Sequence, residues 1–178
     1  MITVGPNSPG TMADDATVGT VSWTNPDNAK INDNIRASVT ILSTETSHYL
    51  KATNFGFSVP VDATISGILV EIKCRVNGSS MNAWTDVRIV KGGSISETSK
   101  TGGSSINTSD STYYSIPSTG GESDLWEDTW TSDDINDSTF GVVMSMTNSS
   151  VSNVLSVDHI RITVYYINPF HPLPSFYQ

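Results

Sequence analysis

Cysteine is almost missing from this sequence, since Cys74 is the single one among 178 residues. A lone cysteine forms no intrachain disulfide and cannot build a metal site from several thiolates. The chain is long enough to bury a sizeable core as one domain, so its stability must come from packing. Cys74 lies on the apolar face of a predicted strand, where a thiol acts as a small core side chain.

Charged residues are also scarce, and basic residues most of all. They make up 15% of the chain, with 9 lysines and arginines against 18 aspartates and glutamates, which gives a net charge of −9. A chain with this balance repels a phosphate backbone. We therefore expect no nucleic-acid partner.

Long apolar runs are missing as well. No stretch approaches the length that crosses a membrane, and the opening MITVGPNSPGTMADD lacks the basic and apolar regions of a secretory signal. These absences predict no membrane partner, no signal peptide and synthesis in a cytoplasm.

The sequence contains none of the motifs that carry a known catalytic mechanism. GxSxG, HExxH, GxGxxG, the Walker loop and the EF-hand loop are all absent. The histidines, His48, His159 and His171, stand far apart in the sequence, whereas a metal site needs several ligands that converge. We predict a protein that is not an enzyme and has no cofactor.

What the sequence does contain is a series of short alternating runs separated by turn residues. These runs predict strands at 16–23, 37–42, 48–59, 64–76, 83–90, 140–147 and 154–167. They predict an all-β fold, an antiparallel β-sandwich of jelly-roll type over residues 16–167. Residues 1–15 show no period and are expected to form an extended N-terminal arm, and the proline-rich residues 168–178 a C-terminal tail.

The run 64–76 is long and has two distinct faces. Ile68, Val70, Ile72 and Cys74 share one face of it, which predicts a core strand. Asn77-Gly78 is a favoured two-residue hairpin turn, so we expect this strand to pair with residues 81–87, with Ile68 opposite Val87.

The acidic stretch 120–142 allows three interpretations. Its carboxylates could bind Ca²⁺, through Asp124, Asp128, Asp133, Asp134 and Asp137. A pair of carboxylates could instead form a glycosidase site. The third interpretation is a solvated loop in which Leu125, Trp126 and Trp130 seal one end of the sandwich. Within this stretch Ser132 is expected to cap one helical turn.

Two sets of side chains are candidates for binding. Trp84, Trp126 and Trp130 could stack on a glycan, although a tryptophan in a sandwich is more often core. The two ends of the chain could contact other subunits or a larger shell, and we expect the residues that do so to be Ile2, Val4, Pro6, Pro9, Met12, Phe170, Leu173, Phe176 and Tyr177.

The segments SHYLKATNFGFSVPVDATISGILVEI, DLWEDTWTSDDINDSTFGV and VDHIRITVYYI together resemble jelly-roll structural proteins of phage and prophage virions. This resemblance covers roughly residues 16–167 and implies a non-enzymatic part of the virion. Capsid decoration proteins, head fibres and tail-associated proteins are of this type. It implies attachment to the outer surface of a phage head, a homotrimer, and the major capsid protein or other virion proteins as partners. The alternative is a carbohydrate-binding jelly-roll module in a tail or receptor-binding part.

Overall fold

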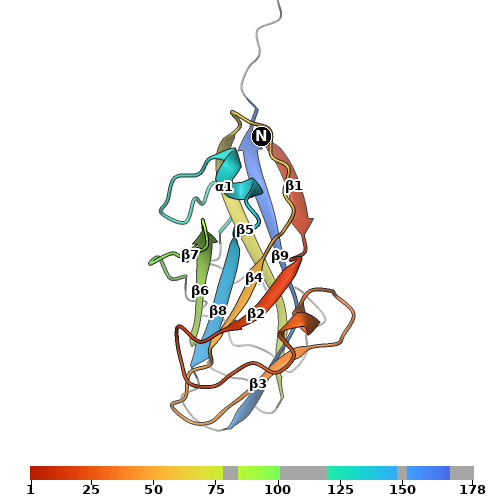
Figure 1. Ribbon diagram of the computed structural model, residues 1–178, viewed down its shortest axis with the longest axis vertical. Helices are drawn as coiled ribbons and strands as arrows, with labels where there is room; N and C mark the ends of the chain where they lie inside the picture. The colour runs from red at the N-terminus through yellow and green to blue at the C-terminus, as the bar shows by residue number, and fades with distance from the viewer. Residues whose placement is uncertain (78–83, 101–119, 148–151, 169–178) are drawn as a thin grey trace, which may run out of the picture.

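The computed structural model describes residues 1–77, 84–100, 120–147 and 152–168, and these residues form a two-layered antiparallel β-sandwich. The predicted fold class is confirmed (Figure 1). The strands are β1 (Ile2–Asn7), β2 (Thr11–Asp15), β3 (Ala37–Ile41), β4 (Tyr49–Thr53), β5 (Thr64–Asn77), β6 (Trp84–Lys91), β7 (Ser94–Ile95), β8 (Gly141–Thr147) and β9 (Asn153–Ile167).

The first layer, sheet A, is organised around β9. One side of β9 pairs with β5 over nearly its whole length, from Thr64 opposite Ile167 to Asn77 opposite Val154. The other side pairs with β1 near one end and with β3 near the other. A single long strand therefore holds three others together.

The second layer, sheet B, has the strand order β2-β4-β8-β6-β7. The chain crosses between the layers at almost every step, with β3 and β5 in sheet A and β4 and β6 in sheet B. After β7 and β8 in sheet B, it returns to sheet A as β9. This alternation is the winding of a jelly roll.

The core lies between the sheets, where alternate side chains of every long strand meet. Ile68, Val70 and Ile72 of β5 are buried, as the two-faced pattern predicts. Large side chains that are almost fully buried come from both sheets and from the 126–140 segment: Trp126, Phe140, Ile41, Leu50, Ile68, Ile72, Ile89, Ile135, Met144, Met146, Leu155 and Ile160.

The segment after residue 119 packs backbone to backbone on the outer edge of β5. Gly120 bridges Leu69, and a Cβ on Gly120 would lie 1.8 Å from the carbonyl oxygen of Ile68, so only glycine fits there. Trp126 then donates its indole N–H to that same carbonyl at 3.1 Å. The predicted sealing role of Trp126 is confirmed, because its ring is fully buried.

Two short helices connect the strands. The 3-10 helix η1 spans Pro26–Ala29, and α1 spans Ser132–Asn136. The predicted helical turn is confirmed, but Thr131 is its cap in place of Ser132, since the Thr131 hydroxyl and the Asp134 carboxylate bond reciprocally to the backbone N–H groups. Neither helix in the described part of the chain has the length and apolar character to cross a membrane.

Three further sequence predictions were wrong. The run 16–23 forms no strand and has only an isolated bridge, from Val21 to Ser47. Residues 1–15 are not an arm: they form β1 in sheet A and β2 in sheet B, so the sandwich begins at Ile2. The predicted hairpin between 64–76 and 81–87 is absent, because β5 lies in sheet A and β6 in sheet B. Ile68 pairs with Val164 of β9, not with Val87.

Candidate functional site

The structure places the N-terminal contact candidates in different environments. Ile2 is 39% exposed and Pro6 is exposed, whereas Val4 packs against the core. Pro9 and Met12 are buried, so these two side chains belong to the fold and are not available to a partner. The C-terminal candidates Phe170, Leu173, Phe176 and Tyr177 lie outside the described residues.

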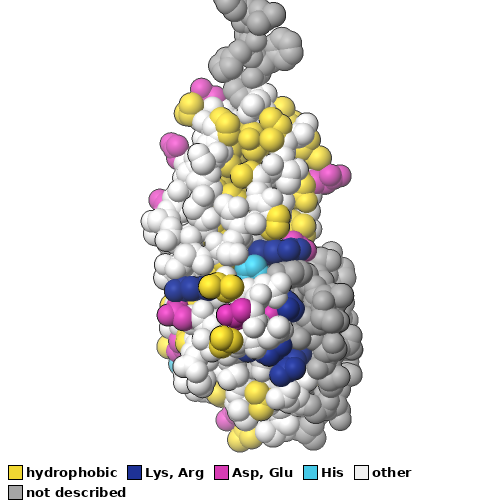
Figure 2. All heavy atoms as spheres, turned by 90° about the vertical axis from the view of Figure 1, so that its right-hand side faces the viewer, with side chains coloured by type: hydrophobic (Ala, Val, Ile, Leu, Met, Phe, Trp, Pro, Cys, Tyr) yellow, Lys and Arg dark blue, Asp and Glu magenta, His cyan; other side chains and the backbone are white. Residues whose placement is uncertain are grey.

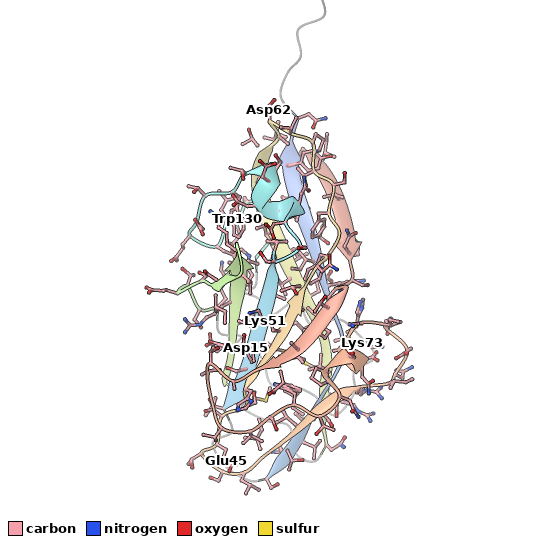
Figure 3. All side chains as sticks on the ribbon, in the orientation of Figure 1. Asp15, Glu45, Lys51, Asp62, Lys73 and Trp130 are labelled. Carbon is pink, nitrogen blue, oxygen red and sulfur yellow. The ribbon has the colours of Figure 1, made fainter. Side chains whose placement is uncertain are left out.

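Exposed apolar side chains gather at one end of the sandwich, which we call the apolar end. It consists of Met1, Ile2, Val61 and Ile167, with exposed fractions of 66%, 39%, 72% and 52%. Pairing of Ile2 with Tyr166 and of Thr64 with Ile167 brings their strands together there. Figure 2 shows apolar side chains in the upper part of this view, and Figure 3 labels Asp62, the neighbour of Val61, at the same end.

Trp126 and Trp130 do not form an open stacking surface. Trp126 is fully buried, and Trp130 is 9% exposed and donates its indole N–H to the Leu125 carbonyl at 2.8 Å. Lys91 and Lys100 each lie about 5 Å over one of these rings. The side chain of Trp84 lies outside the described residues. Neither Trp126 nor Trp130 therefore presents a free face to a sugar.

The aspartates proposed for Ca²⁺ are mostly engaged within the protein. Asp124 forms an ion pair with Lys100, and Asp128 lies 3.3 Å from the Nζ of Lys91. Asp134 belongs to the helix cap, and Asp137 accepts hydrogen bonds from Thr139, while Asp133 is exposed. Among the described residues no group of three or more His, Cys, Asp or Glu side chains is placed to hold a metal ion.

A polar groove lies on the outer face of sheet B. It has a volume of about 480 Å³ and crosses the sheet from β2 to β7. Its lining consists of Asp15, Thr17, Tyr49, Lys51, Arg88, Gly93, Ser94, Ile95, Ser96 and Glu97. Lys51 and Arg88 both pair with Val143, from opposite sides of β8, so they face the same side of the sheet. Figure 3 labels Asp15 and Lys51 close together on β2 and β4.

Ion pairs and hydrogen bonds fix the groove's side chains. The Lys51 Nζ donates to Asp15 at 3.0 Å, and the Thr17 hydroxyl donates to the same carboxylate at 2.7 Å. Burial opposes ionisation of Asp15, but these hydrogen bonds outweigh it and lower its pKa. Asp15 is therefore a carboxylate at neutral pH.

A second network lies beneath the other side of the groove. Asp86 accepts from Arg88 Nε at 2.9 Å and from the Tyr49 hydroxyl at 2.7 Å. Burial, and then the bond to Asp86, raises the pKa of Tyr49 to about 12, so this hydroxyl stays a donor. The Arg88 Nη1 also donates to the Glu97 carbonyl at 3.1 Å.

A third polar cluster lies at a bulge in β9, where Asp158 is an extra residue between the pairs Lys73–His159 and Cys74–Val157. Asp158 is fully buried, forms an ion pair with Lys73 at 2.8 Å, and accepts from the Asn34 backbone at 2.7 Å. Lys73 also donates to Asn32 at 2.5 Å. These contacts fasten the loop after η1 to the sheet.

Beside this cluster, Ser8 and His159 are hydrogen-bonded at 2.8 Å. Burial, and then the nearby Arg161, lowers the pKa of His159, so its imidazole is neutral at neutral pH. Sequence analysis missed this pair because its members are 151 positions apart. Asp158 accepts a hydrogen bond from Asn34 with one oxygen and forms the ion pair with Lys73 through the other, so the cluster holds the fold together at this bulge.

The sequence matches no protein family, and no curated protein is similar to it. One similar solved structure comes from a study of the promiscuous specificity of carbohydrate-binding modules of the β-sandwich superfamily. It is 14% identical, and the match covers 89% of this chain and 56% of that one, with a TM-score of 0.39. The chain thus spans little more than half of that neighbour's length, and a similarity this low supports no conclusion about function.

Proposed function

We propose that this protein is a non-enzymatic virion structural protein that decorates the outer surface of a phage head and binds the major capsid protein. The observation that carries the proposal is the apolar end, where Val61 and Ile167 are 72% and 52% exposed. Contiguous apolar groups on a protein surface mark places that another protein covers. The sequence resemblance to phage virion proteins supports the same role.

The apolar end also adjoins the proposed C-terminal contact segment. Ile167 ends β9, and the next eleven residues include Phe170, Leu173, Phe176 and Tyr177. On this proposal the apolar end and the segment contact the shell together. In the proposed homotrimer, the subunits would contact one another through the apolar end or a surface beside it. Light scattering of the purified chain measures the mass of the oligomer directly.

The test is binding of purified protein to empty phage heads, measured by co-sedimentation. The variant Val61→Ser/Ile167→Ser removes two exposed side chains whose burial would each contribute about 1.5 kcal/mol or more, so binding should weaken at least tenfold. Leu42→Ser is the matched control, since Leu42 is 52% exposed and lies outside the apolar end. Equal binding by the double variant and the wild type would contradict the proposal.

Deletion of residues 1–15 is not a clean test of attachment. It would remove β1 from sheet A and β2 from sheet B, together with the buried side chain of Met12. Loss of binding would then report loss of the fold. Deletion of residues 169–178 leaves every described strand in place and is the better truncation.

The second candidate function is carbohydrate binding, as in a tail or receptor-binding part. The groove on sheet B favours it, because several polar side chains that the fold holds in place converge there beside Tyr49 and Ile95. A glycan array, run with and without Ca²⁺, tests it. Absence of binding to any glycan in both conditions would count against this candidate.

A further inference from the structure

We infer that the groove on the outer face of sheet B is a binding site for a neutral saccharide. The inference rests on the second candidate function, carbohydrate binding, and names the site and the class of sugar. The proposed sugar site is therefore the groove, which the sequence did not predict, and not the buried Trp126 and Trp130.

Buried apolar side chains lie beneath the groove. Tyr49, Val90 and Val143 form a small buried cluster on the outer side of sheet B, and Val18 and Ile95 pack against it. Tyr49 and Ile95 also line the groove. A sugar ring has an apolar face of C–H groups, and the partly exposed Ile95 gives that face an apolar side chain to contact.

The walls offer both donors and acceptors. Lys51 has one hydrogen-bond partner among the described residues, Asp15, so its ammonium group has N–H donors to spare. The Nη2 of Arg88 donates to no described group. Glu97 is exposed and supplies a carboxylate, and Ser94 supplies a hydroxyl. A sugar hydroxyl both donates and accepts, so it needs this mixture.

The charges of the groove favour a neutral ligand over an acidic one. Lys51 and Arg88 balance Asp15 and Glu97 among the lining residues. Each cation is already bound to a carboxylate of the protein, Lys51 to Asp15 and Arg88 to Asp86. An acidic sugar would have to compete with these carboxylates, whereas a neutral hydroxyl can use the remaining donors without breaking either pair.

The size of the groove sets the length of the ligand. Lys51 on β4 and Arg88 on β6 lie on either side of β8, about 10 Å apart at two strand spacings. This span fits one or two sugar rings, with the ends of the ligand open to solvent.

The experiment is titration of the full chain with a panel of neutral monosaccharides and disaccharides, followed by NMR and calorimetry at millimolar sugar. Glucuronic and galacturonic acid are the acidic probes. Lys51→Met keeps the aliphatic stem and removes the donors, and Glu97→Ala removes an acceptor. Lys30→Met is the matched control, because Lys30 also pairs with an aspartate, Asp27 at 2.8 Å, away from the groove. Thermal melting verifies that each variant is folded.

We expect a neutral sugar to bind, and Lys51→Met and Glu97→Ala each to weaken that binding about tenfold, with no change in Lys30→Met. Binding that survives both groove variants would overturn the site while leaving carbohydrate binding intact. Preference for the acidic probes would overturn the proposed class of sugar. Failure of every sugar to bind would overturn both the site and the candidate function.

Discussion

Removal of Lys73 should destabilise the protein more than removal of any surface lysine. In Lys73→Met the Asp158 carboxylate stays fully buried and loses its ion pair, and the Asn34 backbone N–H remains as a hydrogen-bond donor. Breaking a buried pair from one side costs about 3–5 kcal/mol. For a protein of this size that free energy corresponds to a fall in melting temperature of roughly 6–20 °C.

The double variant Lys73→Met/Asp158→Asn tests the cause. Asparagine keeps an oxygen for the Asn34 N–H but carries no charge, so the double variant should recover at least about 2 kcal/mol relative to Lys73→Met. Lys30→Met is the surface control and should cost at most about 1 kcal/mol. Urea denaturation of the four proteins measures these differences. The reasoning fails if Lys73→Met costs under about 1 kcal/mol, or if the double variant is no more stable than Lys73→Met.

Three further predictions concern stability. Gly120→Ala should destabilise the fold by at least about 2 kcal/mol in urea denaturation, because its φ of +108° and the Ile68 carbonyl at 1.8 Å leave no room for a Cβ; a neutral effect would contradict this packing. Because the pKa of His159 is lowered in the folded protein, the unfolded chain takes up a proton first as the pH falls below 6.5. The free energy of unfolding should therefore become smaller as the pH is lowered through this range. His159→Gln should flatten that part of the pH profile, and an unchanged slope would exclude His159 as its cause. Thr131→Ala should cost about 1 kcal/mol by loss of the helix cap, and calorimetry that shows no change in melting temperature would refute this role.

Local pattern was sufficient to predict the strands with strong alternation. The runs 37–42, 64–76, 140–147 and 154–167 became β3, β5, β8 and β9 with nearly the same bounds, since each presents a continuous apolar face to the core. The short strands β1 and β7 were not predicted, because Gly5, Pro6 and the Gly92-Gly93 turn interrupt the alternation there, and β2 was not predicted because Met12 is its one buried side chain.

Pairing was not predictable from the same pattern. The apolar face of β5 matches residues 81–87 and also matches Ile160, Ile162 and Val164 of β9, because any two strands with a period of two can be placed in phase. The Asn77-Gly78 turn favoured pairing of β5 with the strand that follows it. In the structure the chain crosses from sheet A to sheet B between β5 and β6, so the two strands do not pair. Long-range pairing therefore decided the topology.

For the candidate sites too, residues close together in the sequence could be singled out, whereas residues brought together by the fold could not. The sequence singled out aromatic and acidic residues in one stretch, and most of those side chains serve the fold. The groove draws its lining from β2, β4, β6 and β7, so no contiguous segment signals it. Ile2 is one of the predicted contact residues and is 39% exposed, but Val61 and Ile167 join it at the apolar end through the geometry of sheet A.

The position of β9 at the centre of sheet A has a consequence for biosynthesis. Its neighbours β1, β3 and β5 all leave the ribosome before it, and each stays without its sheet partner until residues 153–167 have been made. Pairing with β9 closes long loops of the chain. The conformational entropy lost on closing these loops opposes folding until the strands have paired. Sheet A should therefore assemble only once β9 has been made, and until then its unpaired strand edges need protection from aggregation.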